Sequence, residues 1–160
     1  MDIEELKNKL TGEFPDKIIG EPIINEKALE IEIANQDLLE IAQFAKHELG
    51  FTYGDMAFGI DQKEYMEMNW YIGRPDSPTF LVLKVKIDRD NPTVNSLANI
   101  WYGFNWHERE AYDLLGINFE GHPDLRRIYM PDNWEGHPLR EDYIYKRPKY
   151  YRPEDEYRSE

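Results

Sequence analysis

The fold is decided by residues 65–87, which read YMEMNWYIGRPDSPTFLVLKVKI. In residues 66–72, and again in residues 81–87, every second side chain is apolar, which is the pattern of a strand with one buried face. Two prolines, an aspartate and a serine lie between the two halves, and these residue types favour turns. The segment therefore predicts a β-hairpin with one face in the core.

The hairpin is expected to belong to a larger sheet. Residues 29–33 alternate in the same way, and residues 53–60 show a weaker strand pattern. Apolar stripes at helical spacing predict two helices. One lies near the start of the chain and ends at Gly12, and the other runs from a cap at Asn35 to a stop at Gly50. Together these elements predict an α+β fold, with a mixed or antiparallel sheet covered by helices on one face.

The composition restricts the possible partners. The 160 residues include 19 Lys+Arg and 32 Asp+Glu, a formal net charge of −13, which disfavours nucleic acid and anionic lipid. There is no cysteine, so disulfides, thiol catalysis and cysteine-held clusters are excluded. No apolar run approaches the roughly 18 residues that span a bilayer, and the acidic start is unlike a secretory signal. We expect a soluble, cytoplasmic domain without a cofactor of its own.

The chain after the hairpin is expected to be helical and then irregular. Ser96 is placed to cap a short helix that runs through Trp101, and Asn105 is placed to cap a longer helix that runs to Leu115. Gly116 follows as a stop. Beyond this glycine, regularly spaced prolines prevent any long helix or central strand.

The longer helix carries an unusual set of charged residues. Arg109 and Asp113 lie four residues apart and are expected to pair. Glu108 points into the apolar stripe, for which there are two interpretations. It can complete a capping box by reaching back to the backbone of the cap residue, or it can be a buried carboxylate that needs a cation, for which Arg126 and Arg127 are available.

Two similar stretches follow, residues 119–127 (FEGHPDLRR) and residues 134–142 (WEGHPLRED). His122 and His137, each with a nearby glutamate, raise the possibility of a stand-alone metal-dependent hydrolase. Neither histidine is on a helix, no His-x-x-x-His pair is present, and no third ligand is fixed by the spacing. Rigid turns that present arginines and aromatic side chains to other surfaces are therefore favoured.

These motifs carry a family resemblance. Residues 105–117 (NWHEREAYDLLGI), 119–128 (FEGHPDLRRI) and 136–143 (GHPLREDY) are similar to the 30-kDa subunit, also called the C subunit, of proton-pumping NADH dehydrogenase, respiratory complex I. The spacing of Glu-Arg-Glu-x-x-Asp before His-Pro-x-x-Arg-Arg is highly specific, and the preceding α/β module has the expected order and size. The same family supplies subunits to membrane-bound nickel–iron hydrogenases and to related archaeal reductases and dehydrogenases.

The resemblance implies a subunit with no catalytic residue, no cofactor and no metal of its own. Such a subunit lies on the cytoplasmic side of the cell membrane, in the peripheral arm, without inserting into the bilayer. There it would help to assemble and hold the large hydrogenase-like subunit, in the module that passes electrons from iron–sulfur clusters of partner subunits towards quinone. The residues expected at the partner interface or in the structural motif are Trp106, Glu108, Arg109, Glu110, Asp113, His122, Arg126, Arg127, His137, Arg140, Tyr143, Tyr145, Tyr150 and Tyr151.

The chain is expected to consist of a compact α/β domain, residues 1–120, and an extended arm rich in proline, tyrosine and arginine, residues 121–160. Residues 138–160 contain five tyrosines, whose burial alone would not offset the entropy lost on ordering the segment, so a partner is expected to hold it. The sequence leaves open an NADH:quinone oxidoreductase, a hydrogenase-type or archaeal complex, the hydrolase, and an acidic adaptor. It also leaves open the electron donor and acceptor, the translocated ion and the stoichiometry.

Overall fold

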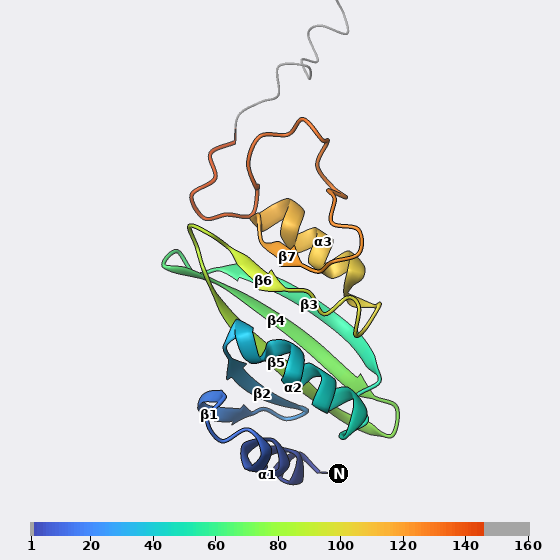
Figure 1. Ribbon diagram of the computed structural model, residues 1–160. Helices are drawn as coiled ribbons and strands as arrows, with labels where there is room; N and C mark the ends of the chain where they lie inside the picture. Colours follow the sequence, from blue (N-terminus) through green and yellow to red (C-terminus); the bar gives the residue numbers. More distant parts are fainter. Residues whose placement is uncertain (1, 146–160) are drawn as a thin grey trace, which may run out of the picture.

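The computed structural model describes residues 2–145. The elements in chain order are α1 (Ile3–Glu13), β1 (Ile18–Ile24), β2 (Ala28–Ile33), α2 (Asn35–His47), β3 (Tyr53–Asp61), β4 (Tyr65–Arg74), β5 (Ser77–Asp88), β6 (Thr93–Asn95), α3 (Phe104–Leu115) and β7 (Asn118–Glu120). Five strands form one sheet in the order β1-β2-β5-β4-β3, and β6 pairs with β7 (Figure 1). None of the helices in the described part of the chain is long and apolar enough to cross a membrane.

The predicted hairpin is confirmed as β4 and β5, the centre of the sheet. Trp70 of β4 lies opposite Leu83 of β5, and Leu83 lies opposite Ile31 of β2. The pairs β1–β2, β3–β4 and β4–β5 are antiparallel, whereas β2 and β5 are parallel. The sheet is therefore mixed, and inward side chains line up across neighbouring strands.

All three helices contribute to a core on one face of this sheet. Leu10 of α1, Ala42 of α2 and Leu115 of α3 belong to one buried cluster together with Trp70 and Leu83. Figure 1 shows α2 lying across the sheet, with α1 and α3 towards its two edges. In residues 2–145 no helix covers the opposite face. The predicted α+β fold, with a mixed sheet covered on one face, is confirmed.

Several local predictions were wrong. Helix α1 continues through Gly12. Asn35 is the first residue of α2 and not its cap, because its side chain accepts a hydrogen bond from the Asn95 amide instead. The segment that begins at Ser96 forms turns and no helix. Strand β1 was missed because Gly20, with φ +70°, and Pro22 break its strand pattern.

Candidate functional site

The charged motif lies on α3 and on the chain that folds back over it. The helix ends as predicted, with Gly116 in the left-handed conformation at φ +79°. A Cβ atom there would also lie 2.7 Å from the His137 ring, so glycine allows the returning chain to pack closely. The start differs from the prediction, because α3 begins at Phe104 after Gly103 and Asn105 does not cap it.

Glu108 is completely buried and connects α3 to the sheet and to the turn after β6. Its Oε1 accepts hydrogen bonds from Trp70 Nε1 at 3.0 Å and from the Leu97 amide at 2.8 Å. Its Oε2 accepts one from Ser96 Oγ at 2.5 Å. The capping box is absent. The buried carboxylate is confirmed, but no arginine within residues 2–145 pairs with it. Neutral donors satisfy it.

Burial dominates the ionisation of Glu108. It raises the pKa from 4.5 to about 7, against the opposing effect of the hydrogen bonds from Ser96, Leu97 and Trp70. An imidazole nitrogen, His122 Nε2, lies 4.0 Å from Oε2. Burial also lowers the pKa of His122. This imidazole is therefore neutral at pH 7 and supplies no counter-charge.

Asp113 lies near the C-terminal end of α3 and binds residues 127–130 of the chain that folds back over the helix. The carboxylate is completely buried, and its Oδ1 accepts a hydrogen bond from Arg127 Nη1 at 3.1 Å. Its Oδ2 accepts hydrogen bonds from three successive amides, those of Ile128, Tyr129 and Met130, at 2.7–3.0 Å. Charged acceptors form stronger hydrogen bonds than neutral ones, so one side chain fixes this whole turn.

The predicted pair between Arg109 and Asp113 is absent, because each residue binds the returning chain separately. Arg109 Nε donates to the Arg126 carbonyl at 3.1 Å. The Arg109 guanidinium also lies 5.1 Å from the ring centre of Trp106, which is within the range of a cation–π contact. Arg109 is almost completely buried, whereas Trp106 is 61% exposed. The arginine thus supports an exposed indole.

The two Gly-His-Pro turns pack against the backbone of α3. His122 Nε2 donates to the Asn105 carbonyl at 3.1 Å, and its Nδ1 accepts from the Asp124 amide at 3.0 Å. His137 Nδ1 donates to the Asp113 carbonyl at 2.9 Å. Within residues 2–145, no group of three or more His, Asp or Glu side chains lies close enough to hold a metal ion. Each histidine instead holds its turn against α3 through a hydrogen bond to the helix backbone.

A second anchor lies where the arm reaches the ends of β3 and β5. Asp61 Oδ1 and Oδ2 accept hydrogen bonds from Arg89 Nε and Nη2, both at 2.8 Å, and Oδ2 also accepts from the Glu141 amide at 3.0 Å. The Arg89 guanidinium holds the pKa of Asp61 well below its usual range. Arg89 also pairs with Asp142 at 3.1 Å, and Arg140 Nη2 donates to the Arg89 carbonyl at 3.4 Å. The arm is therefore tied to the domain at both ends of residues 121–142.

The remaining motif residues lie nearer the surface. Glu110 and Tyr143 are half-buried, and the Arg126 side chain is 70% exposed and pairs with Asp124. Tyr145 is exposed beside Trp134, at a ring-centre distance of 6.2 Å. The predictions for Tyr150 and Tyr151 lie outside the described residues.

Sequence reasoning missed the partners that complete these networks. Trp70 and Ser96 hold Glu108, and Asp61 with Arg89 holds the end of the arm. No sequence spacing links them, because Trp70 and Glu108 are 38 residues apart and meet only through the fold. The one available signal was the polar side chain at Ser96, shortly before a helix whose glutamate faces inward.

With this geometry described, comparison with known proteins is informative. Residues 31–149 match the family described as "Respiratory-chain NADH dehydrogenase, 30 Kd subunit". The chain is 35% identical to the C subunit of NADH-quinone oxidoreductase from Roseiflexus sp. (strain RS-1), over 89% of this chain and 84% of that protein. It is 33% identical to the C subunit of F(420)H(2) dehydrogenase from Methanosarcina mazei, over 89% of this chain and 92% of that protein.

A solved structure shares the fold. A chain of the membrane-bound sulfane sulfur reductase, an archaeal respiratory membrane complex, superposes with a TM-score of 0.75 at 22% identity, covering 88% of this chain and 85% of that chain. The family match covers well over half of the chain and includes strands β3 to β6, the Glu-Arg-Glu helix and the two Gly-His-Pro turns. The protein therefore belongs to the 30-kDa subunit family of the respiratory-chain NADH dehydrogenase.

Proposed function

We propose that this chain is a non-catalytic, peripheral-arm subunit of a complex I-type, ion-translocating membrane oxidoreductase. In that complex it helps to assemble and hold the large hydrogenase-like subunit, beside iron–sulfur subunits that carry the electrons. Family membership supports this role, as does the naming of the relatives as the C subunits of NADH-quinone oxidoreductase and F(420)H(2) dehydrogenase. The absence of cysteine from the sequence is consistent with clusters that belong to the partners.

The internal use of the charged motif is the observation that carries the proposal. A catalytic acid or base must reach a substrate proton. Glu108 and Asp113 are instead completely buried and bind donors of this chain. His122 and His137 donate to carbonyl groups of α3. The motif thus builds a rigid platform, whose exposed Trp106 is suited to contact another protein.

The same role in a membrane-bound nickel–iron hydrogenase or a related archaeal complex is the second candidate. The specific reason is the F(420)H(2) dehydrogenase relative from Methanosarcina mazei, which is about as similar to this chain as the NADH-quinone oxidoreductase relative is. The large partner distinguishes the two. Nickel-ligating Cys-x-x-Cys pairs in its sequence would identify a hydrogenase, and their loss would identify a quinone reductase or another reductase.

Truncation after Tyr145 tests the role in assembly. The anchors at Asp113 and Asp61 lie within the retained chain, so the truncated protein is expected to fold with an unchanged circular dichroism spectrum. We expect it to lose most of its co-purification with the large subunit, because residues 146–160 hold five of the 19 lysines and arginines and three tyrosines. The measurement is quantitative mass spectrometry of the complex purified through a tag on this chain.

The full-length tagged chain is the control in the same cells. Recovery of the large and iron–sulfur subunits with the full chain supports the proposed function. If the full chain recovers none of them, the proposed function is wrong. If the truncated chain recovers them as well as the full chain does, the tail is not needed for assembly.

A further inference from the structure

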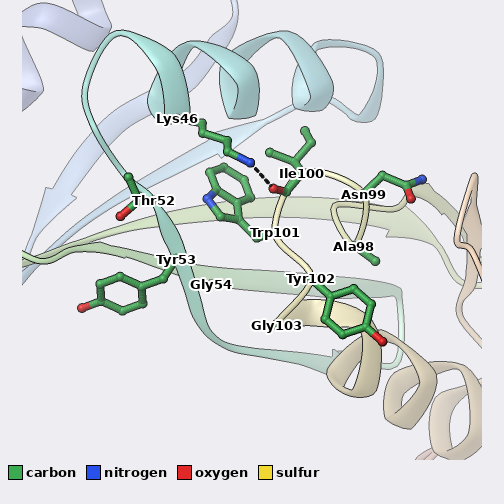
Figure 2. Close-up of a pocket in the computed structure, with 10 residues that line it drawn as sticks. All are labelled: Lys46, Thr52, Tyr53, Gly54, Ala98, Asn99, Ile100, Trp101, Tyr102 and Gly103. Atoms are coloured by element: carbon green, nitrogen blue, oxygen red, sulfur yellow. Dashed lines mark hydrogen bonds between the residues drawn. The ribbon is translucent and has the colours of Figure 1, made fainter.

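A cavity of about 520 Å³ lies between the end of α2, the start of β3 and the turn that leads into α3. Figure 2 shows its lining, with Lys46 reaching in from α2 and residues 98–103 forming the opposite wall. None of the residues that form it belongs to the charged motif described above.

Two glycines in the lining of the cavity, Gly54 and Gly103, are in close contact. A Cβ atom on Gly103 would lie 2.8 Å from the Gly54 carbonyl oxygen, and a Cβ atom on Gly54 would lie 2.7 Å from the Phe104 ring. Both distances are shorter than a normal van der Waals contact. These two segments can therefore approach one another this closely only without side chains at positions 54 and 103.

Among the described residues, Lys46 is the only cation that lines the cavity. Its ammonium group donates to the Ile100 carbonyl at 2.5 Å, as Figure 2 shows. No carboxylate of residues 2–145 lies within ion-pair distance of Lys46. An ammonium group has three N–H donors, so two of them can bind a further acceptor in the cavity. In a chain with a net charge of −13, Lys46 is thus a local positive charge in the cavity.

Aromatic side chains frame this cation. Trp101 is buried and fixed, because its Nε1 donates to the Phe51 carbonyl at 2.9 Å. Tyr53 and Tyr102 lie on opposite sides of the cavity in Figure 2, and they are 39% and 76% exposed. Exposed tyrosines around a fixed indole are typical of the centre of a protein interface. Tyr102 also lies just before α3, whose first turn carries the exposed Trp106.

We propose that this cavity receives an acidic segment of a partner subunit, with a carboxylate bound to Lys46 and apolar atoms packed on Tyr102. This proposal rests on the proposed function, because it assumes a partner subunit in a respiratory complex. A polypeptide suits the site better than a small molecule, because the cavity is open and Tyr102 in its lining is 76% exposed. The positive charge of Lys46, the one cation in the described lining of the cavity, gives the acidic segment a favourable contact there.

The test compares charge variants of the chain within the purified native complex. Lys46→Glu is expected to speed dissociation of this chain from the complex by at least about tenfold, since it places like charges at the contact. Lys46→Arg keeps the charge and is expected to dissociate at close to the wild-type rate. The matched control is Lys27→Glu, which changes an exposed lysine outside the cavity. It is expected to leave the rate unchanged.

A photo-reactive benzoyl-phenylalanine at position 102 identifies the occupant. We expect a cross-link to one partner peptide that contains Asp or Glu. Equal dissociation of Lys46→Glu and Lys27→Glu would overturn the proposal, and so would cross-links only to lipid or to peptides without acidic residues. These outcomes differ from the result expected if the proposed function is wrong. If the proposed function is wrong, the wild-type chain itself would not co-purify with respiratory subunits.

Discussion

Replacing Asp113 by alanine is expected to detach the turn at residues 127–130 from α3 and to lower the free energy of unfolding by about 3–5 kcal/mol. The variant removes a completely buried carboxylate that accepts hydrogen bonds from Arg127 and from three backbone amides. After the substitution, the Arg127 guanidinium and the three amides would lose this hydrogen-bond acceptor. Donors left unsatisfied in a buried site account for most of the expected loss.

Two measurements check this result. Chemical denaturation gives the change in stability, and limited trypsin digestion reports whether the bonds after Arg126 and Arg127 become accessible. Asp132→Ala is the matched control, because this aspartate of the same returning chain is exposed; its loss should be below about 1 kcal/mol. A stable Asp113→Ala variant with an unchanged digestion pattern would show that the carboxylate does not hold the arm.

The fold was largely predictable because its signals are local. The hairpin of β4 and β5 needs only alternating side chains and a turn between them, and the end of α3 needs only Gly116. Strand β1 was not predictable, since Gly20 and Pro22 oppose a strand and pairing with β2 overrides them. The expected cap at Asn35 failed for a similar reason, because Asn95 from a distant strand binds that side chain.

The candidate site was predictable in its residue types but not in its contacts. The inward direction of Glu108 followed from helical spacing, yet its partners come from β4 and from the turn after β6. The arginines expected to neutralise it bind elsewhere: Arg127 goes to Asp113, and Arg126 pairs with Asp124. Spacing along one helix predicts which side chains share a face, but the fold decides which of several oppositely charged partners is reached.

The ionisation of Glu108 should make stability depend on pH near neutrality. Burial raises its pKa from 4.5 to about 7, so between these values the folded protein binds a proton that the unfolded chain releases. This contribution to stability is fully present below about pH 4.5, falls as the pH rises, and is lost above about pH 7. A shift of this size corresponds to about 3 kcal/mol in total. Other carboxylates titrate in the opposite sense, so the effect must be measured as a difference.

The Glu108→Gln variant is the reference for this measurement, because the glutamine side chain has the same shape as glutamate but does not ionise. Its carbonyl oxygen can accept from Trp70 Nε1 and the Leu97 amide, which share Oε1 in the wild type, while its amide group donates to Ser96 Oγ. From pH 5 to pH 8, the stability of the wild type relative to Glu108→Gln is expected to fall by about 2–3 kcal/mol, as measured by urea denaturation at each pH. Glu110→Gln, on a half-buried glutamate of the same helix, is the control for removing one carboxylate from α3. A flat difference for Glu108→Gln would mean that the carboxyl group stays ionised in the folded protein, stabilised by its three donors.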